Sequence, residues 1–279
     1  MIKAWLKRAI RSSVQLTHRT ALGRYRHEVI VSAAMQRATT VLHDGVRFMF
    51  AVPNALCRYR AETFATKEPE TLEWIDALPA GAVLWDIGAN VGLYSVYAAK
   101  KRNCRVFAFE PSVFNLELLA RNVTLNGVSD RVCIVPIALN DALGPSELRM
   151  TTMEWGGSLS TFGHDVGWDG KAVRQVFGFQ TLGLSMEDAV QRLGLPQPDY
   201  IKMDVDGIEH IILKGGAAVL RVLKSVLIEV NDDFHEQSAQ CASLLTQAGL
   251  AIAAKRHSDL IEQSTTGFSQ TYNQIWVRA

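Results

Sequence analysis

Polar and small residues alternate along one short stretch of the chain, at Asp86, Gly88, Asn90 and Gly92. The apolar run 83–85 before them is typical of the end of a buried strand. Apolar residues recur at helical spacing over 93–97. The stretch therefore predicts a strand, a tight glycine turn and a helix. Such a turn lets a ligand approach the backbone and the free N–H groups of the helix N-terminus.

The two common nucleotide loops fit this turn poorly. A dinucleotide loop has the pattern G-x-G-x-x-G, and here Asn90 stands where the middle glycine belongs. A P-loop ends in G-K-[ST], whereas Gly92 is followed by Leu93 and Tyr94. What remains is D-x-G-x-N-x-G, in which an acid opens the turn. An acid there suits a positively charged ligand, and S-adenosylmethionine carries both a sulfonium and an ammonium group.

A second acid, Glu110, ends the next predicted strand, "RVFAFE". A carboxylate at that place can accept hydrogen bonds from both hydroxyls of a ribose. Taken alone, the glycine pattern also fits a structural turn, and Glu110 alone fits a solvated strand end. Because both occur in order, each after a predicted strand, we favour a cofactor site. The expected cofactor-binding residues are Asp86, Gly88, Asn90, Gly92, Glu110, Pro111, Ser112 and Asp204.

Further carboxylates follow the fourth and fifth predicted strands, where Asp204 ends "YIKM" and Glu229 lies near the end of "SVLIEV". Carboxylates at adjacent strand ends can converge on one point. They could bind a divalent cation, hold the methionine ammonium group or take a proton from the acceptor. The candidate catalytic residues are Asp204, Glu229 and Asp206. The candidate ligands of a metal are Asp204, Glu229 and Asn231.

Other polar residues near these strands have structural explanations as well. Asp206-Gly207 also fits a plain turn, and Glu209 suits the N-terminus of a helix. Lys202 lies inside a buried strand, where a lysine needs a carboxylate partner. Residues that could serve as bases or stacking surfaces, or simply pack, are His164, His210, His235, Trp155 and Trp168.

The elements that must position these residues alternate between strand and helix. Strands are predicted at "VLWDI", "RVFAFE", "RVCIVPIAL", "YIKMD" and "SVLIEV", with helices between them. This order predicts a parallel sheet with helices on both faces. "LAIAAKR" and "YNQIWVRA" predict an edge hairpin. The interval 141–188, rich in Gly, Trp, Phe and Thr, predicts an insertion that covers the carboxyl edge of the sheet and the substrate.

Four segments, in order, resemble the FkbM family of S-adenosylmethionine-dependent methyltransferases, over roughly residues 44–230. They are "DIGANVGLYSVYAA", "EPSVFNLELLARNVTLN", "ALNDALGPSEL" and "YIKMDVDGIEHIILKGG", and the last is the most specific. The resemblance implies a class I methyltransferase, an α/β Rossmann-like fold with a seven-stranded sheet whose last strand is reversed. It also implies an enzyme that methylates a hydroxyl of a sugar, glycan or natural product.

The chain departs from the family pattern at two positions. Asp206 stands where the family usually has glutamate, and Gly183 stands where an aspartate commonly follows Thr-Leu. The expected division is an N-terminal extension over 1–80, with a basic helix, a strand pair and a helix, and a methyltransferase domain over 81–279. Alternatives are a nucleic-acid or protein methyltransferase, or a protein that binds the cofactor without catalysis. The sequence "DVDG" after the fourth strand disfavours methylation of a base amine, which usually uses N/D-P-P-F/Y.

The composition limits which binding partners and which cellular compartment are expected. The 279 residues carry a formal net charge of +1, so no global basic field is available for nucleic acid. Four scattered cysteines without a C-x-x-C pair favour a reduced, cytoplasmic protein. No apolar run reaches the length of a membrane span. The oligomeric state is not indicated.

The first residues, "MIKAWLKRAIRSSVQLTHRT", contain five basic residues and no acid. Apolar residues, with Trp5 among them, fall on one helical face. Three interpretations remain: a helix packed on its own domain, a helix that contacts the membrane surface peripherally, or an organellar transit peptide.

Overall fold

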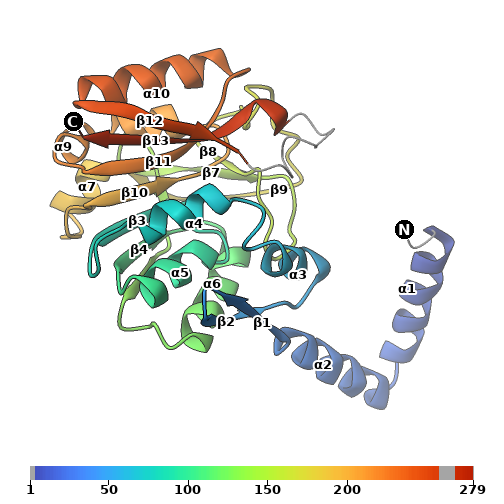
Figure 1. Cartoon of the computed structure of the whole chain (residues 1–279). Helices are drawn as coiled ribbons and strands as arrows, with labels where there is room; N and C mark the ends of the chain where they lie inside the picture. The colour runs from blue at the N-terminus through green and yellow to red at the C-terminus, as the bar shows by residue number, and fades with distance from the viewer. Residues whose placement is uncertain (1–3, 258–267, 279) are drawn as a thin grey trace.

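The computed structural model describes residues 4–257 and 268–278 and is built around a seven-stranded sheet (Figure 1). The strand order across the sheet is β12 (Leu250–Arg256), β13 (Thr271–Arg278), β11 (Ser225–Asn231), β10 (Tyr200–Met203), β3 (Val83–Ile87), β4 (Arg105–Phe109) and β5 (Val132–Val135). The strands from β11 to β5 are parallel, and β13 is antiparallel to both of its neighbours. The expected seven-stranded α/β fold with a reversed last strand is therefore confirmed.

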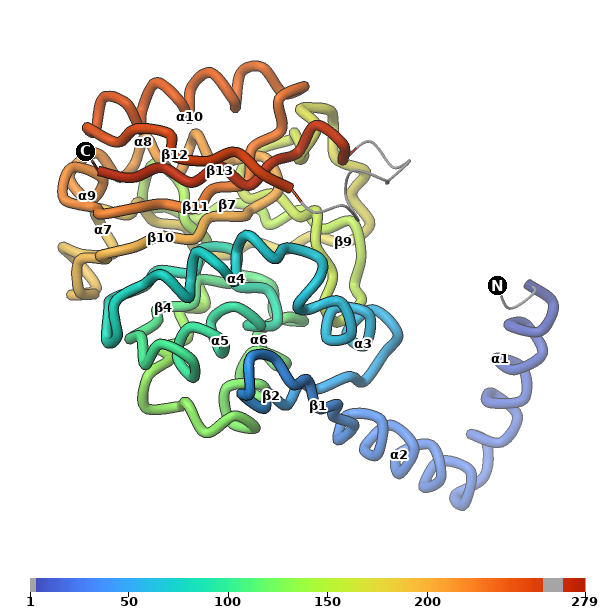
Figure 2. The backbone as a smooth tube through the Cα atoms, viewed as in Figure 1, coloured from blue at the N-terminus to red at the C-terminus, as the bar shows by residue number. Residues whose placement is uncertain are grey.

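Alternation along the strands divides the core between the two faces of the sheet. In β3, Trp85 and Ile87 belong to one buried cluster and Leu84 to the other. The helices that contribute to the first cluster are α7 (Met186–Gln191), α8 (Glu209–Lys214), α9 (Ala217–Leu220) and α10 (His235–Gln247). Those of the second are α3 (Ala55–Glu62), α4 (Pro69–Asp76), α5 (Leu93–Lys101) and α6 (Val113–Leu125), and Figure 2 shows α10 on the opposite side of the sheet from α4 and α5.

The insertion and the short strand before it form a second sheet over the first cluster. Its order is β6 (Ala138–Leu139), β9 (Phe177–Leu184), β7 (Gly144–Met150) and β8 (Thr161–Phe162). The single strand predicted over 131–139 is thus two strands, because Pro136 has no N–H to continue the ladder. Leu148, Phe162 and Leu184 pack in the same cluster as Trp85, so the insertion is part of the core as well as a cover.

The hairpin of β1 (Ala38–His43) and β2 (Val46–Ala51) packs on the opposite face. Phe48 and Phe50 are buried there, and the Phe48 ring lies 5.4 Å from that of Tyr97 in α5. The division of the chain at residue 80 stays a prediction, and hydrophobic packing continues across that point.

The two N-terminal helices, α1 (Ala4–His18) and α2 (Ala21–Met35), extend from the body as an arm (Figure 1). No residue of α1 is buried, and in α2 only Gly23 is. The interpretation of the first helix as packed on its own domain is therefore wrong, since an amphipathic helix without a partner keeps its apolar face in solvent. Among the described helices, none has the length and apolar character needed to cross a bilayer.

Candidate functional site

The glycine turn follows β3 and has three residues in the left-handed region, with φ of 82° at Gly88, 50° at Asn90 and 80° at Gly92. A Cβ atom on Gly88 would lie 1.8 Å from the carbonyl oxygen of Asp204, and one on Gly92 would lie 2.2 Å from a methyl group of Leu119. The two glycines are therefore required by close packing inside the protein. Asn90 tolerates its positive φ because its side-chain oxygen accepts the N–H of Val91.

Glu110 comes directly after β4 and is held by backbone groups on both sides. Asn90 N donates to its Oε2 at 2.8 Å, and Ser112 N donates to its Oε1 at 2.7 Å. Burial raises the pKa of Glu110 to about 7, although these two hydrogen bonds act against the rise. Each oxygen keeps a free lone pair, so the carboxylate is oriented and can still accept bonds from a ligand.

Buried charges lie under the turn, where Asp86 of β3 is in register with Lys202 of β10. Lys202 Nζ donates to Asp204 Oδ2 at 3.0 Å, which confirms the expected carboxylate partner. Burial lowers the pKa of Lys202, but Asp204 and Asp86 outweigh it and the pKa rises. Asp86 Oδ2 accepts from Ser95 at 2.5 Å, while its buried Oδ1 has no partner among the described residues.

Three carboxylates converge beyond the ends of β10 and β11. One oxygen each of Asp204, Asp206 and Glu229 lies within 4.8 Å of the others. Burial, and then the charge of Asp204, raises the pKa of Asp206 to about 6 and that of Glu229 well above its usual value. Asp206 and Glu229 therefore hold a proton more readily than isolated carboxylates do.

The turn that carries Asp206 is fixed by Glu209, which lies in the first turn of α8 as the sequence predicted. Glu209 is buried and accepts hydrogen bonds from the backbone N–H groups of Val205 and Gly207, both at 3.0 Å. Asp206 has a φ of 62° and accepts from Leu159 N at 2.7 Å. Glu209 therefore clamps the 205–207 turn, so that Asp206 faces the insertion.

Asn231 is not brought into this cluster. Its Nδ2 donates to the carbonyl of Trp168 at 3.2 Å, and its Oδ1 accepts from Asp233 N at 3.0 Å. Both side-chain atoms therefore hold loops together. Trp168 stacks on Phe268 with ring centroids 4.0 Å apart. Five residues were considered as bases or stacking surfaces, and none of them lines the three cavities of this site. They are His164, His210, His235, Trp155 and Trp168.

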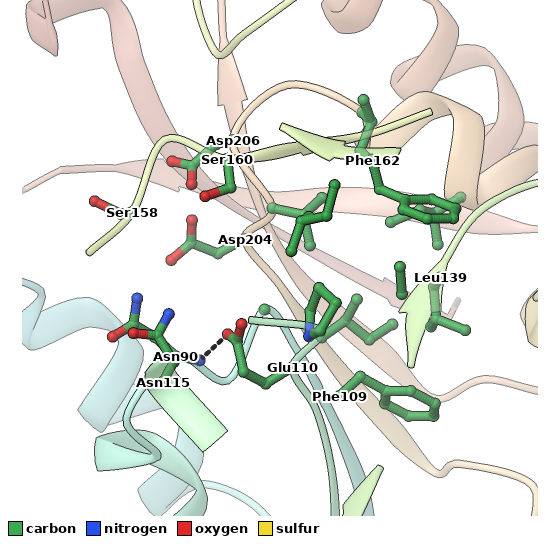
Figure 3. Close-up of a pocket in the computed structure, with 18 of the residues that line it drawn as sticks. Asn90, Phe109, Glu110, Asn115, Leu139, Ser158, Ser160, Phe162, Asp204 and Asp206 are labelled. Atoms are coloured by element: carbon green, nitrogen blue, oxygen red, sulfur yellow. Dashed lines mark hydrogen bonds between the residues drawn. The ribbon is translucent and has the colours of Figure 1, made fainter. Parts of the chain in front are cut away.

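The first cavity has an apolar end and a polar end (Figure 3). Phe109, Leu139 and Phe162 form the apolar end, two of them from the insertion side. Glu110 and Asp204 lie at the polar end, with Asn90 and Asn115 beside Glu110 (Figure 3). The apolar end suits a flat heteroaromatic ring, and the oriented Glu110 beside it suits a diol. These residues fit an adenosine group.

Two further cavities meet the first one, since Gly88, Asn90 and Asp204 line all three. The second cavity lies between the glycine turn and the segment that joins α3 to α4. The third, with a volume of about 400 Å³, has the acidic cluster on one side and Tyr59, Arg60 and Phe268 around it. Of the predicted cofactor residues, Asp86, Gly92 and Ser112 line none of the three; they support the residues that do.

Some residues that shape the first cavity were not predicted from the sequence. Asn115 Oδ1 accepts from Gly156 N at 3.1 Å, and its Nδ2 donates to Gly157 O at 3.1 Å, so α6 holds the insertion loop over the cavity. A Cβ atom on Gly183 would lie 2.2 Å from the ring of Phe162. The glycine that departs from the family pattern thus makes room for this ring. The asparagine in "FNLELL" was the one available signal for Asn115.

The comparisons with known proteins agree with this arrangement. Residues 86–252 match the model of the methyltransferase FkbM domain. The chain is 29% identical over 170 residues to the hexuronic acid methyltransferase AglP of Haloferax volcanii, covering 61% of this chain and 63% of that one. It is 28% identical over 162 residues to the methyltransferase sdnD of Sordaria araneosa, covering 50% of this chain and 61% of that one. The matched region spans about three fifths of each relative.

Among solved structures, M. jannaschii TYW2 in complex with AdoMet aligns with a TM-score of 0.44 and 12% identity, covering 87% of each chain.

Proposed function

Because this chain belongs to the FkbM methyltransferase family, we propose that it transfers a methyl group from S-adenosylmethionine to a hydroxyl group of a sugar, glycan or natural product. One observation supports this most strongly. The cavity that fits an adenosine group and the larger cavity beside the carboxylates share Gly88, Asn90 and Asp204. A methyl donor in the first cavity and an acceptor in the third would meet at this point.

Bound S-adenosylmethionine would supply an electrophilic methyl group. The chain would hold the acceptor in line and take up the proton that its hydroxyl loses, while the oxygen–carbon bond forms and the carbon–sulfur bond breaks to leave S-adenosylhomocysteine. Glu229 lines only the third cavity, and burial raises its pKa well above the usual value. A carboxylate with a raised pKa is a stronger base, so Glu229 is the proton acceptor in this proposal, with Asp206 beside it.

Asp204 has a different role in this proposal. It lines all three cavities, and its Oδ2 is bound by the Lys202 ammonium group. A carboxylate at the place where the three cavities meet can attract the positive charge of the cofactor. Asp204 is therefore assigned to anchoring the positively charged end of the cofactor.

The third cavity suits a small acceptor. Its volume of about 400 Å³ falls within the ~300–1,000 Å³ common for small-molecule sites. Tyr59 and Phe268 offer aromatic faces to a sugar ring. The acidic cluster would repel a polyanion, which disfavours nucleic acid as the acceptor. The likeness to a hexuronic acid methyltransferase supports a sugar.

The test is a transfer assay with S-adenosylmethionine labelled in the methyl group. We expect label in sugar or glycan hydroxyl acceptors, and mass spectrometry should locate it on oxygen. A total RNA fraction and a protein fraction serve as parallel acceptors. Label confined to RNA or protein, or a protein that binds the cofactor and methylates none of these, would contradict the proposal.

The acidic cluster would also suit a divalent cation by its chemistry, because Mg²⁺ and Mn²⁺ prefer oxygen ligands. Asp204, Asp206 and Glu229 would hold it. We favour direct proton transfer, since the Lys202 ammonium group already occupies Asp204 Oδ2 at 3.0 Å. A chelator should therefore leave transfer unchanged. Loss of activity with a chelator, restored by magnesium or manganese, would assign the cluster to a metal.

The arm formed by α1 and α2 is proposed to contact an anionic membrane surface. Lys7, Arg8 and Arg11 are exposed on α1, together with Trp5 at 65% and Ile10 at 51% exposure. A helix that is both basic and apolar suits anionic headgroups. The full chain should sediment with phosphatidylglycerol vesicles, less so at high salt, and stay in solution with phosphatidylcholine vesicles. Equal behaviour with both lipids would contradict this contact.

A further inference from the structure

The charge of the chain is divided unevenly along its length. Residues 1–60 contain eleven lysines and arginines and only two acidic residues, although the whole chain has a net charge of +1. The remaining residues therefore carry a net negative charge, and the acidic cluster is among them. A nearly neutral chain with one strongly basic end is typical of a protein that binds an anionic surface through that end.

The basic end also exposes large apolar side chains. In α2, Leu22 is 70% and Tyr25 is 64% exposed, and Trp5 and Ile10 of α1 are exposed as well. Nucleic acid is bound mainly through contacts of basic side chains with phosphates. The headgroup region of an anionic bilayer, by contrast, takes up both the basic and the apolar side chains of a helix. The arm therefore suits a lipid surface better than a nucleic acid.

The third cavity reaches the surface of the protein at α3. Leu56, Tyr59 and Arg60 of this helix line the cavity together with Glu229, and Tyr59 is 51% exposed. Tyr59 therefore lies at the mouth of the cavity. Arg58, the residue before it, is exposed as well. An aromatic side chain next to a basic one suits the headgroup region of a membrane.

The arm lies on the same side of the body as this mouth. Figure 1 shows α2 leaving the body on the side where α3 lies, with α1 beyond α3 on that side. An amphipathic helix at a bilayer lies in the plane of the interface. A membrane bound by α1 would therefore face the side of the body on which the third cavity opens.

We infer that the acceptor is also held at the membrane, as a sugar or glycan carried on a lipid. The cavity of about 400 Å³ suits a sugar ring, so the lipid would stay in the bilayer while the sugar enters past Tyr59. Binding the enzyme and the acceptor to one surface raises their effective concentration without any new contact in the cavity. This inference rests on the proposed function, and it adds the form in which the acceptor is presented.

The test offers the full chain two fractions of the cells that produce it, with S-adenosylmethionine labelled in the methyl group. One is the lipid extract, incorporated into phosphatidylglycerol vesicles, and the other is the water-soluble sugar fraction. We expect label in the lipid extract, released by mild acid as a methylated sugar, at a rate at least about tenfold above that of the soluble fraction at equal sugar concentration. Equal rates, or label only in the soluble fraction, would overturn the inference and leave the proposed function standing. Label in neither fraction would overturn both.

Two matched variants separate the arm from the rest of the protein. Arg8→Gln combined with Arg11→Gln removes two charges from α1. It should methylate the lipid fraction at least about tenfold more slowly, and the sugars released from that lipid within about twofold of the wild-type rate. Lys214→Gln combined with Arg221→Gln removes two exposed charges that flank α9, on the opposite side of the body from α3 (Figure 1), and should change neither rate.

The arm variant also gives the outcomes that would contradict the inference. An equal loss of rate with the lipid-carried and the released sugars would show that the two arginines act on the reaction itself. No loss with either form would show that the arm does not bring the enzyme to its acceptor. An arm that binds RNA and leaves the vesicles unbound would assign the basic end to nucleic acid. Each of these results would overturn the inference.

Discussion

Two carboxylate sites lie on either side of Asp204, and they are built in opposite ways. In the first cavity, Glu110 has each oxygen fixed by a backbone N–H, at 2.8 and 2.7 Å. Beside the third cavity, Asp204, Asp206 and Glu229 crowd within 4.8 Å of one another. Burial raises the pKa of Glu110 and of Glu229 alike, so the shift alone does not distinguish their roles.

The difference lies in what surrounds each acid. Backbone donors orient Glu110 and favour its charged form, as recognition of a diol requires. Neighbouring carboxylates disfavour the charged form of Glu229, so that this group readily takes a proton. The comparison shows that a raised pKa gains a functional meaning only from the donors and charges that face the group.

The largest expected effect comes from replacing Glu229, the proposed proton acceptor. Glu229→Gln keeps the shape of the side chain and removes its charge, so turnover should fall by roughly 10²–10⁴-fold, the usual worth of general base catalysis. Affinity for S-adenosylhomocysteine should stay unchanged, which calorimetry can check. A folded variant with normal turnover would remove Glu229 from the chemistry and end the contrast with Glu110.

Replacing Glu110, the carboxylate proposed to bind the ribose, should lower the affinity for the cofactor rather than the turnover. Glu110→Ala should weaken cofactor binding by about 1.5–3 kcal/mol, the scale for a hydrogen bond to a charged group. Turnover at saturating cofactor should change much less, because the acceptor side is intact. Calorimetry and steady-state kinetics on the same preparation would measure both, and unchanged affinity in a folded protein would refute the ribose assignment.

The pH profile should sharpen the same contrast. A base must be unprotonated, so transfer should be lost as pH falls through the raised pKa of the acidic cluster, which is about 6 at Asp206 and raised also at Glu229. At saturating substrates, we expect turnover to fall about tenfold per pH unit below that point. Asp206→Asn should move this limb to lower pH, because a nearby negative charge has been removed. A limb that does not move would separate Asp206 from the titrating group.

The smallest effect is expected from the N-terminal arm. A variant lacking residues 1–20 removes α1, in which no residue is buried. It should remain folded, bind S-adenosylhomocysteine as the full chain does and methylate soluble acceptors at the same rate, while losing affinity for anionic vesicles. A folded truncated protein that fails to bind the cofactor ligand would show that the arm belongs to the site.

The sequence by itself determined the parts of the site that depend on local pattern. The glycine turn after β3, Glu110 after β4 and Asp204 after β10 were all predicted, because strands and turns have short-range signals and parallel strands end at one edge of a sheet. The same rule predicted that Glu229 would lie close to Asp204. The family match over residues 86–252 covers these elements.

Only the tertiary structure decided which neighbours each residue meets. Gly88 is required by the carbonyl of Asp204, 116 positions later in the chain, and Gly183 by the ring of Phe162. The Asn231 side chain forms hydrogen bonds with backbone groups of neighbouring loops, whereas Asp206 belongs to the acidic cluster. These outcomes depend on long-range packing and on which buried polar atoms find partners, and neither leaves a periodic signal in the sequence.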